Sequence, residues 1–408
     1  MTEQTNTPIL RFKGFNDEWS LSTIGALGDF YYGKSAPKWS ITKDVGIPCI
    51  RYGELYTKFN NVVNEIYSYT SMPKEKLRFS KGGEILIPRV GEDPLDFAKC
   101  VYLPQKDIAI GEMISVYNTK ENPLFLTYYF NTKMKYEFAK RVEGASVSNL
   151  YYSYLEDIKL KIPDIREQQK LGVFFSKLDR QIELEEEKLE LLEQQKRGYM
   201  QKIFTQKLRF KDKTGNIYPN WKTTELKDIL EKIIDNRGKT PDNAPSEKYP
   251  LLEVNALGYY HPSYKKVSKF VSEDTYNNWF REHLKENDIL FSTVGNTGIV
   301  SLMDNYKAVI AQNIVGLRVN NNNIPSFVYY MLSYWENQKK IKRIQMGAVQ
   351  PSVKVSQFKF IKYLIPIKDE QEKIANLLSE IDKVINKQLI KIEVLKQRKQ
   401  GLLQKMFV

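Results

Sequence analysis

Apolar side chains recur in alternating steps of four and three residues along two long stretches of the chain. The first series is Leu171, Phe175, Leu178, Ile182, Glu185, Leu189, Leu192, Lys196, Tyr199 and Ile203. The second series is Ile374, Leu378, Ile381, Ile385, Gln388, Ile392, Leu395, Lys399, Leu402 and Met406. This is the heptad pattern of helices that pair along one seam. We therefore predict two long helices, called the first and second arm, whose seam positions pair them.

Each predicted arm begins shortly after a proline. Pro163 and Pro366 cannot sit inside a helix, and acidic residues that follow them suit the first turn. At 1.5 Å per residue, a helix from 167 to 204 would be about 57 Å long. One alternative is that each arm only covers the core of its own domain. The sustained seam favours the pairing of arm with arm.

Charge along the seams indicates the orientation of this pair. A parallel pair would place Lys196 against Lys399. An antiparallel pair can instead place Glu185 beside Lys399 and Lys196 beside Gln388. Because opposite charges attract and like charges repel across a helix pair, we predict antiparallel arms in this register. The globular parts would then lie at opposite ends of a rod, matching two DNA half-sites about 34–36 Å apart.

The arms are the best-preserved part of an internal repeat with a displacement of 203 residues. Between 163 and 205, 16 of 43 positions are identical with those from 366 to 408. Upstream the match is looser: LRFK recurs at Leu10 and Leu208, and Trp19 corresponds to Trp221. A repeat of this length indicates duplicated domains. Since Leu10 is the counterpart of Leu208, the repeat also predicts that Leu10 lies near the end of the second arm.

The predicted fold class is α+β. Two pseudo-symmetric globular domains of mixed α/β structure are separated by an antiparallel coiled coil of two long helices. The domains are expected at 1–162 and 208–365, and the arms at 163–207 and 366–408.

The charge of the chain points to a polyanionic partner. The net charge is +13 and the pI is near 9.2. The stretches 166–204 and 369–407 together carry +2, so +11 remains for the rest of the chain, chiefly the globular repeats. Such a balance favours nucleic acid or an acidic surface.

Other features of the composition exclude several classes of protein. Two cysteines and two histidines argue against a disulfide scaffold, a histidine metal site and a catalytic triad. No apolar run approaches the length of a membrane helix, and the polar start of the sequence carries no secretion signal. We expect a cytoplasmic protein without a membrane partner.

One stretch, GDFYYGKS from Gly28 to Ser35, fits the phosphate-loop pattern, but Pro37 follows at once where a helix is needed. The second copy lacks the first glycine, and neither methyltransferase nor nuclease signatures are evident. We therefore expect no catalytic residue, no metal site and no cofactor in this chain, and no enzymatic activity of its own. The shared glycine–lysine turn is more typical of a loop that presents Lys34 and Lys239.

Basic and polar residues in the globular repeats are the candidates for DNA contact. Arg and Lys suit guanine edges or phosphates, and Asn and Gln suit adenine. The candidates in the first repeat are Tyr31, Tyr32, Lys34, Lys38, Arg51, Arg89, Lys99, Arg141, Ser146, Ser148 and Asn149. Those in the second are Arg237, Lys239, Thr240, Asn255, Ser292, Asn296, Arg343, Gln345, Gln350 and Lys354. For any one of them, a solvated surface position is the alternative.

The repeated pattern resembles that of a known family. The end of each copy contains the dipeptide IP, followed after a few residues by the pattern EQxK. The predicted helix then carries SxLD in the first copy and SxID in the second, and it ends in the pattern KxGxxQKxF. These residues are similar to those of the specificity subunit of Type I restriction–modification systems, over essentially the whole chain. The resemblance implies two target recognition domains, each reading one half of a split double-stranded DNA sequence, with the helices as spacer.

The resemblance also implies partner subunits. Two modification subunits would dock on the helices and use S-adenosylmethionine to methylate adenine. Restriction subunits would add translocation and cleavage driven by ATP with magnesium. Because the two globular repeats diverge, the two half-sites should differ. The alternatives are a coiled-coil scaffold, or another basic interaction protein without sequence-specific DNA readout, and a free-standing enzyme.

The repeat leads to a testable expectation about the ends of the chain. In the repeat, Val408 corresponds to Thr205 and Leu10 corresponds to Leu208. Thr205 and Leu208 are joined by a short linker, so Val408 and Leu10 should also lie close together. A variant that joins the natural ends and is opened in a surface loop should therefore fold. We expect one cooperative urea transition with a midpoint close to that of the parent chain. An aggregated product would contradict the pseudo-symmetry, and the same opening without the joint is the control.

Overall fold

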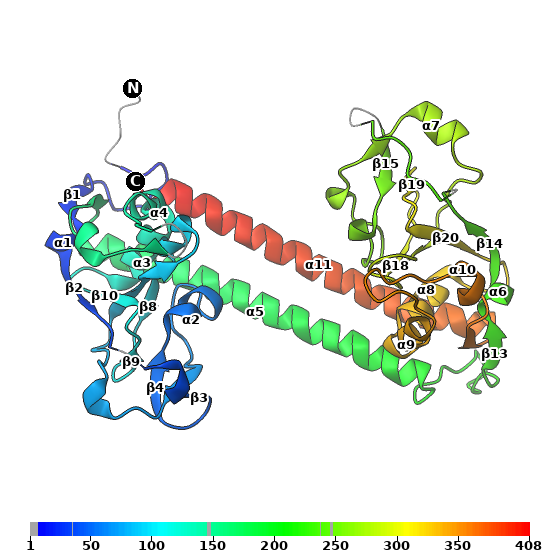
Figure 1. Cartoon of the computed structure of the whole chain (residues 1–408), viewed down its shortest axis with the longest axis horizontal. Coiled ribbons are helices and arrows are strands. Elements are labelled where there is room, and N and C mark those ends of the chain that lie inside the picture. Colours follow the sequence, from blue (N-terminus) through cyan, green and yellow to red (C-terminus); the bar gives the residue numbers. More distant parts are fainter. Residues whose placement is uncertain (1–6, 35, 145–147, 237, 245–247) are drawn as a thin grey trace. The chain divides into compact units, whose positions relative to one another are not determined.

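The computed structural model describes residues 7–34, 36–144, 148–236, 238–244 and 248–408. Contacts divide the chain into two units, Met1–Glu186 with Lys391–Val408, and Glu187–Ile390. Each unit contains one globular domain and a part of each of the two long helices, α5 (Ile165–Phe204) and α11 (Lys368–Met406) (Figure 1). We call the globular domains head 1 (residues 7–162) and head 2 (residues 208–365).

Head 1 is built on two four-stranded sheets. The antiparallel sheet has the order β2 (Gly28–Tyr32), β10 (Ile114–Thr119), β6 (Glu84–Pro88), β8 (Val101–Leu103). The other has the order β3 (Ile41–Thr42), β5 (Ser68–Thr70), β4 (Ile47–Ile50), β9 (Ala109–Ile110), with β4 and β9 parallel. Two strand pairs complete the domain: β1 (Ser20–Thr23) with β12 (Lys159–Ile162), and β7 (Val90–Gly91) with β11 (Ser148–Asn149).

Short helices cover the sheets of head 1. They are α1 (Ile24–Leu27), α2 (Tyr52–Thr57), α3 (Pro123–Lys133) and α4 (Lys135–Ala139). Helix α3 begins where the sequence dictates, because the side chain of Asn122 accepts a hydrogen bond from the N–H of Phe125 and Pro123 occupies the first turn. Strand β6 is buried along its whole length, which explains its unbroken apolar run between Glu84 and Pro88.

Head 2 repeats this plan with different side chains. Its antiparallel sheet has the order β14 (Leu230–Ile234), β20 (Ile314–Val319), β17 (Ile289–Ser292), β18 (Val300–Leu302). A three-stranded sheet has the order β16 (Phe270–Val271), β15 (Tyr249–Leu252), β19 (Val309–Ile310), again with one parallel pair. Strand β13 (Lys222–Glu225) pairs with β21 (Lys362–Ile365). The helices are α6 (Leu226–Ile229), α7 (Glu273–Asn278), α8 (Pro325–Ser333), α9 (Trp335–Arg343) and α10 (Val355–Phe358). The predicted fold class, with two repeated mixed α/β domains and a long helix after each, is confirmed.

The two long helices run in opposite directions within each unit. In the first unit Lys391 pairs with Glu185 at 2.6 Å, Lys396 with Glu186, and Lys399 with Asp179. From Lys391 to Lys399 along α11, the paired residue moves back along α5 from Glu185 to Asp179. The two helix segments are therefore antiparallel. In the second unit, an ion pair at 2.6 Å joins Lys196 of α5 to Asp382 of α11. Every seam position named above is buried or half-buried.

The predicted register of the helices is wrong by about one heptad. Lys399 pairs with Asp179, and Glu185 accepts from Lys391 instead. In the second unit Lys196 pairs with Asp382, where Gln388 was expected. Asp179 and Asp382 each follow a seam residue directly. Contacts with residues of the heads fix the position of each aspartate and therefore its ion pair. Asp179 also accepts hydrogen bonds from Tyr128 and Asn61 of head 1, at 2.6 and 2.8 Å.

One cluster of tyrosine, aspartate and lysine is therefore present in both units. The hydroxyl of Tyr128 donates to Asp179, and that of Tyr330 donates to Asp382 at 2.7 Å. The amino groups of Lys399 and Lys196 lie 5.6 and 5.4 Å from the centroids of the respective tyrosine rings. Burial, then the nearby aspartate, raises the pKa of both phenols, so they remain donors. In each cluster the lysine comes from one repeat and the other two residues from the other.

The end of each long helix completes the core of the other repeat's head. Phe407 packs against Trp19, Phe125 and Phe175 with ring centroids 5.4–6.4 Å apart. Phe204 packs in the same way against Trp221, Phe327 and Tyr334, at 4.9–6.2 Å. These aromatic contacts bury large apolar surfaces, so neither head has a complete core without the end of the other arm.

The chain also enters each head by the same pair of contacts. The N–H of Leu10 donates to the carbonyl of Lys405 and that of Leu208 to Lys202, both at 2.9 Å. Arg11 pairs with the buried Glu167, and Arg209 pairs with the buried Glu370. The expected position of Leu10 beside the end of the second arm is confirmed.

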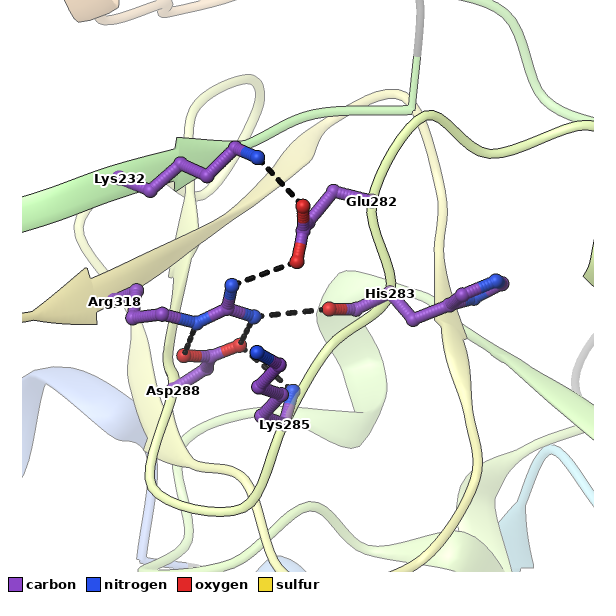
Figure 2. A network of polar contacts seen from close by, with 6 residues as sticks. All are labelled: Lys232, Glu282, His283, Lys285, Asp288 and Arg318. Carbon is purple, nitrogen blue, oxygen red and sulfur yellow. Dashed lines mark hydrogen bonds and ion pairs between the residues drawn. The ribbon is translucent and has the colours of Figure 1, made fainter.

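A buried arginine holds part of head 2 together (Figure 2). Nε and Nη2 of Arg318, on β20, donate to the two oxygens of Asp288 at 3.0 and 2.9 Å. Nη1 donates to Glu282 at 2.7 Å, and Glu282 also accepts from Lys232 of β14. Nη2 reaches the carbonyl of His283 at 3.0 Å. The network ties two strands to the segment 282–288.

Head 1 keeps the carboxylate of this network but changes its partner. Glu84 occupies the position of Asp288, next to the central strand. It accepts a hydrogen bond from the hydroxyl of Tyr31, and from the N–H groups of Lys81 and Gly82 at 2.9 and 3.3 Å. A buried carboxylate needs donors, and the two heads supply them from different strands.

Removing the charge of Asp382 should weaken the second unit. In Asp382→Asn the amide still accepts from Tyr330, but the partly buried Lys196 loses its anion. We expect a loss of about 1–3 kcal/mol in the free energy of unfolding, measured with urea. Glu380→Gln is the control, because Glu380 and its partner Lys383 are 67% and 65% exposed, and its effect should stay below about 0.5 kcal/mol. Equal effects of the two variants would contradict this role.

The network around Arg318 predicts a response to acid. Hydrogen bonds from Lys232 and then Arg318 lower the pKa of Glu282 from 4.5 to about 2. A carboxylate with a lowered folded-state pKa stabilises fully above its unfolded pKa, and this is lost as the pH falls. Wild-type stability should therefore fall more steeply than that of Glu282→Gln between about pH 4.5 and 2. Urea unfolding across this range tests it. Parallel curves would count against the network, and Glu380→Gln is again the control.

Candidate nucleic-acid interface

Two loops pair at the end of the central sheet in head 2. The segment 293–298 follows β17, and the segment 344–353 precedes α10; together they are the head 2 loop pair. The N–H of Gly295 donates to the carbonyl of Pro351, and that of Val353 to Thr293, both at 2.8 Å. The side chain of Gln345 donates to the hydroxyl of Thr297. Hydrogen bonds thus hold the two loops together and connect them to the end of the sheet.

The second of these loops closes on itself. Met346 and Ser352 exchange two backbone hydrogen bonds at 2.8 Å. Gly347 between them has a φ of +89°, and a Cβ there would lie 2.7 Å from the carbonyl oxygen of Gln350. Only glycine fits this turn, because a side chain would be strained and in collision. The local sequence GAVQP therefore fixes a tight, exposed turn.

Head 1 contains the same construction, the head 1 loop pair, formed among the described residues by 89–93, 142–144 and 148–150. Strands β7 and β11 pair there, and the N–H of Leu150 donates to the carbonyl of Arg89 at 2.9 Å. The guanidinium of Arg89 lies 4.6 Å from the ring centroid of Tyr32 and 5.1 Å from that of Tyr151. Cation–π contacts of this kind hold the arginine side chain in one place.

The structure brings about half of the predicted contact residues to the two loop pairs. At head 1 these are Arg89, Ser148 and Asn149, with Tyr32 stacked on Arg89. At head 2, Asn296, Gln345 and Gln350 lie in the loops, Ser292 donates to the carbonyl of Asn296 at 2.7 Å, and Arg343 and Lys354 flank the second loop. Ser146 and Arg237 lie outside the described residues.

Other predicted residues have different surroundings. The hydroxyl of Tyr31 is held by Glu84, and burial raises its pKa strongly. Arg141 pairs with Glu137 at 3.0 Å, and Arg51 precedes α2 as its N-cap residue. Lys99 borders a cleft that also contains Asp179 and Lys399. The remaining four lie in loops or short turns on the heads: Lys38, Lys239, Thr240 and Asn255.

The stretch that fits a phosphate loop has another role. The N–H groups of Gly33 and Lys34 donate to the carbonyls of Ile114 and Ile110 at 3.0 and 2.9 Å. A Cβ on Gly33 would lie 2.1 Å from the carbonyl oxygen of Gly111, so this glycine permits close backbone packing. The turn continues from the sheet, and the backbone N–H groups of Gly33 and Lys34 are already used. Lys34 itself is exposed.

Sequence reasoning missed several residues of these surfaces. Tyr151 holds Arg89, and Tyr152 stacks on Phe30 with ring centroids 5.3 Å apart. Val349, at the tip of the head 2 turn, is 99% exposed. The run LYYSYL signalled an aromatic cluster, whereas Val349 gave no signal because an aliphatic residue is normally expected in a core.

Metal-ligand clusters and cysteine thiols are two sources of chemistry that the described residues could offer. No group of three His, Cys, Asp or Glu that could hold a metal ion is found among these residues. Cys49 and Cys100 are buried free thiols, and burial raises the pKa of Cys49 to about 11 and that of Cys100 well above its usual value. Both thiols therefore stay protonated and unreactive. Among the described helices, none is long and apolar enough to cross a membrane.

Comparison with known proteins identifies the family of this chain. The model of the Type I restriction modification DNA specificity domain matches residues 16–194 and again 218–395. The Type I restriction enzyme MjaVIII specificity subunit of Methanocaldococcus jannaschii is 24% identical over 74% of this chain and 75% of its own length. A putative MjaX specificity subunit from the same organism is 29% identical over 48% of each chain.

Solved structures show the same fold. A Type I restriction–modification S subunit from M. genitalium covers 98% of this chain and 99% of its own, with a TM-score of 0.64 and 16% identity. A chain from a study of complex assembly and conformational transition of the Type I system covers 97% and 99%, with a TM-score of 0.56 and 14% identity. The family match in both repeats, with relatives named as specificity subunits, leads to one conclusion: this chain belongs to the specificity subunits of Type I restriction–modification systems, which are non-catalytic components of their complexes.

Proposed function

We propose that this chain reads a bipartite, asymmetric target in double-stranded DNA, with one half-site for each head. The observation that carries the proposal is the loop pair, which both heads build on the same backbone plan with different side chains. Head 1 presents Arg89 between two tyrosines, whereas head 2 presents Asn296, Gln345 and Gln350. Arginine suits guanine and amides suit adenine, so two unlike half-sites are expected.

The charge of head 2 favours this reading. The stretch from 334 to 362, which contains the second loop, has seven basic residues and one acidic residue. Lysine and arginine on such a segment neutralise phosphates and release their counterions. Those contacts would position the head, and the loop pair would then distinguish bases. Four exposed or loop lysines among the other predicted residues, Lys34, Lys38, Lys99 and Lys239, are proposed as phosphate contacts.

The long helices are proposed to dock two modification subunits and, through them, restriction subunits. Leu191 of α5 and Val394 of α11 are equivalent in the repeat and are 64% and 54% exposed. Apolar residues that are exposed at equivalent positions of the two helices suit two copies of one partner. S-adenosylmethionine, ATP and magnesium would belong to those partners, in the cytoplasm. The helices would also set the spacing between half-sites.

The alternative is a basic scaffold without sequence-specific DNA readout. A scrambled duplex separates the two, because binding through phosphates does not depend on the base sequence. Equal affinity for the target motif and for a scrambled duplex would favour the scaffold.

Methylation-site sequencing tests the proposal in cells that express this chain with its neighbouring modification subunit. We expect methyladenine in a split motif with unlike halves. Gln350→Ala should relax about one position in one half and leave the other half unchanged, because the amide belongs to head 2 alone. Asn322→Ala is the control, as an exposed amide in the turn before α8.

An unsplit or symmetric motif, or methylation that does not depend on this chain, would overturn the proposal. A Gln350→Ala variant that changes both halves together would also contradict the assignment of one half-site to each head.

A further inference from the structure

An aliphatic side chain stands alone at the tip of the head 2 loop pair. Val349 is 99% exposed, and Met346 at the base of the same turn is 45% exposed. Exposed aliphatic residues are common on surfaces when they are scattered. Val349 differs from such scattered residues because hydrogen bonds hold the turn that carries it.

The support of Val349 comes from the backbone. Met346 and Ser352 close the turn with two hydrogen bonds, and Pro351 accepts a third from Gly295 of the neighbouring loop, all at 2.8 Å. Gly347 adopts the positive φ that the turn requires. The tip is therefore held in one orientation before any ligand binds, which lowers the entropy cost of a contact made there.

The surroundings of the tip indicate what would cover it. Lys342, Arg343 and Lys354 are exposed on the two flanks of the loop, within the stretch from 334 to 362 that carries seven basic residues and one acidic residue. An apolar surface of a partner protein would take the exposed cations out of water without supplying anions for them. A nucleic acid duplex offers phosphates for the cations and base edges for the tip.

The base edges of DNA offer one apolar group that an aliphatic side chain such as Val349 can contact, the 5-methyl group of thymine. In the major groove, thymine presents its 5-methyl group, and the adenine paired with it presents N6 and N7 to an amide side chain. Gln350 follows Val349 directly and is exposed as well. The two neighbouring side chains match the two chemical features of an adenine–thymine pair.

We propose that Val349 contacts the 5-methyl group of a thymine in the half-site of head 2, with Gln350 directed to adenine beside it. This proposal deepens the proposed function and rests on it. Val349 is thereby a specificity-determining residue that excludes bases without a methyl group at this position. Residues 145–147, at the corresponding turn of head 1, lie outside the described residues.

Uracil in place of thymine tests the contact, because it removes one methyl group and nothing else. The assembled complex of this chain with its modification subunits is titrated with fluorescent duplexes of the motif found by methylation sequencing. Each thymine of the head 2 half-site is replaced in turn by uracil. We expect one replacement to weaken binding about fourfold, the effect of losing one buried methyl group.

Variants of the tip complete the cycle. Val349→Ala should bind the thymine duplex about fourfold more weakly and show no further loss with uracil, because the contact is already absent. Val349→Ile keeps an aliphatic tip and should keep the sensitivity to uracil. Uracil in the other half-site is the control, since its effect should be the same in all three proteins. Because Val349 is 99% exposed, both substitutions should leave the folding of the chain unchanged, and equal urea midpoints check this.

Two results would overturn the inference while leaving the proposed function intact. One is specific binding that is insensitive to uracil at every thymine of the half-site. The other is a uracil effect that persists unchanged in Val349→Ala. Binding of the motif no tighter than a scrambled duplex would overturn the proposed function itself, and the inference with it.

Discussion

The ion pairs between the two long helices are the interaction on which the rest of the structure depends. Asp179 and Asp382 each accept a hydrogen bond from a tyrosine of a head and an ion pair from a lysine of the other repeat. A partly buried carboxylate with these donors is costly to break, because its partners would remain desolvated. Each cluster therefore joins head and both helices at one point and fixes the register of the helix segments within its unit.

The exchange of helix ends follows from the same arrangement. Phe204 and Phe407 each enter the core of the head that belongs to the other repeat. Burial of such aromatic side chains contributes several kcal/mol, so head 1 is stabilised by the far end of the chain and head 2 by the helix that directly precedes it. Trp19 and Phe125, which contact Phe407, recur in the second repeat as Trp221 and Phe327, which contact Phe204, whereas the exposed side chains of the loops do not recur. The core contacts must be kept for the heads to fold, whereas the side chains of the exposed loops can change without loss of the fold.

The heads show how far this divergence extends without loss of the fold. Glu84 and Asp288 occupy the same place, yet one is held by a tyrosine and the other by an arginine with two further charges. The loop pairs keep their backbone hydrogen bonds and change their exposed side chains. A rigid base with variable tips suits recognition, because the base fixes position and the tips supply the chemistry. The proposed half-sites follow from this division.

The sequence by itself determined the duplication, the long helices, their antiparallel order and the basic character of the heads, because these depend on periodicity and on charge summed over many residues. The fold class could be predicted for the same reason, and so could the place of Leu10 beside the second arm. Only the tertiary structure decided the register, since Asp179 is selected by Tyr128 and Asn61 of a head, and not by the seam. It also decided which candidates gather at the loop pairs: a long-range hydrogen bond from Gln345 to Thr297, which no local pattern encodes, joins Gln345 to the loop that carries Asn296, while Tyr31 turns to a buried carboxylate. Local periodicity reports which face of an element is buried, but the partner against which it is buried is chosen by contacts between distant segments.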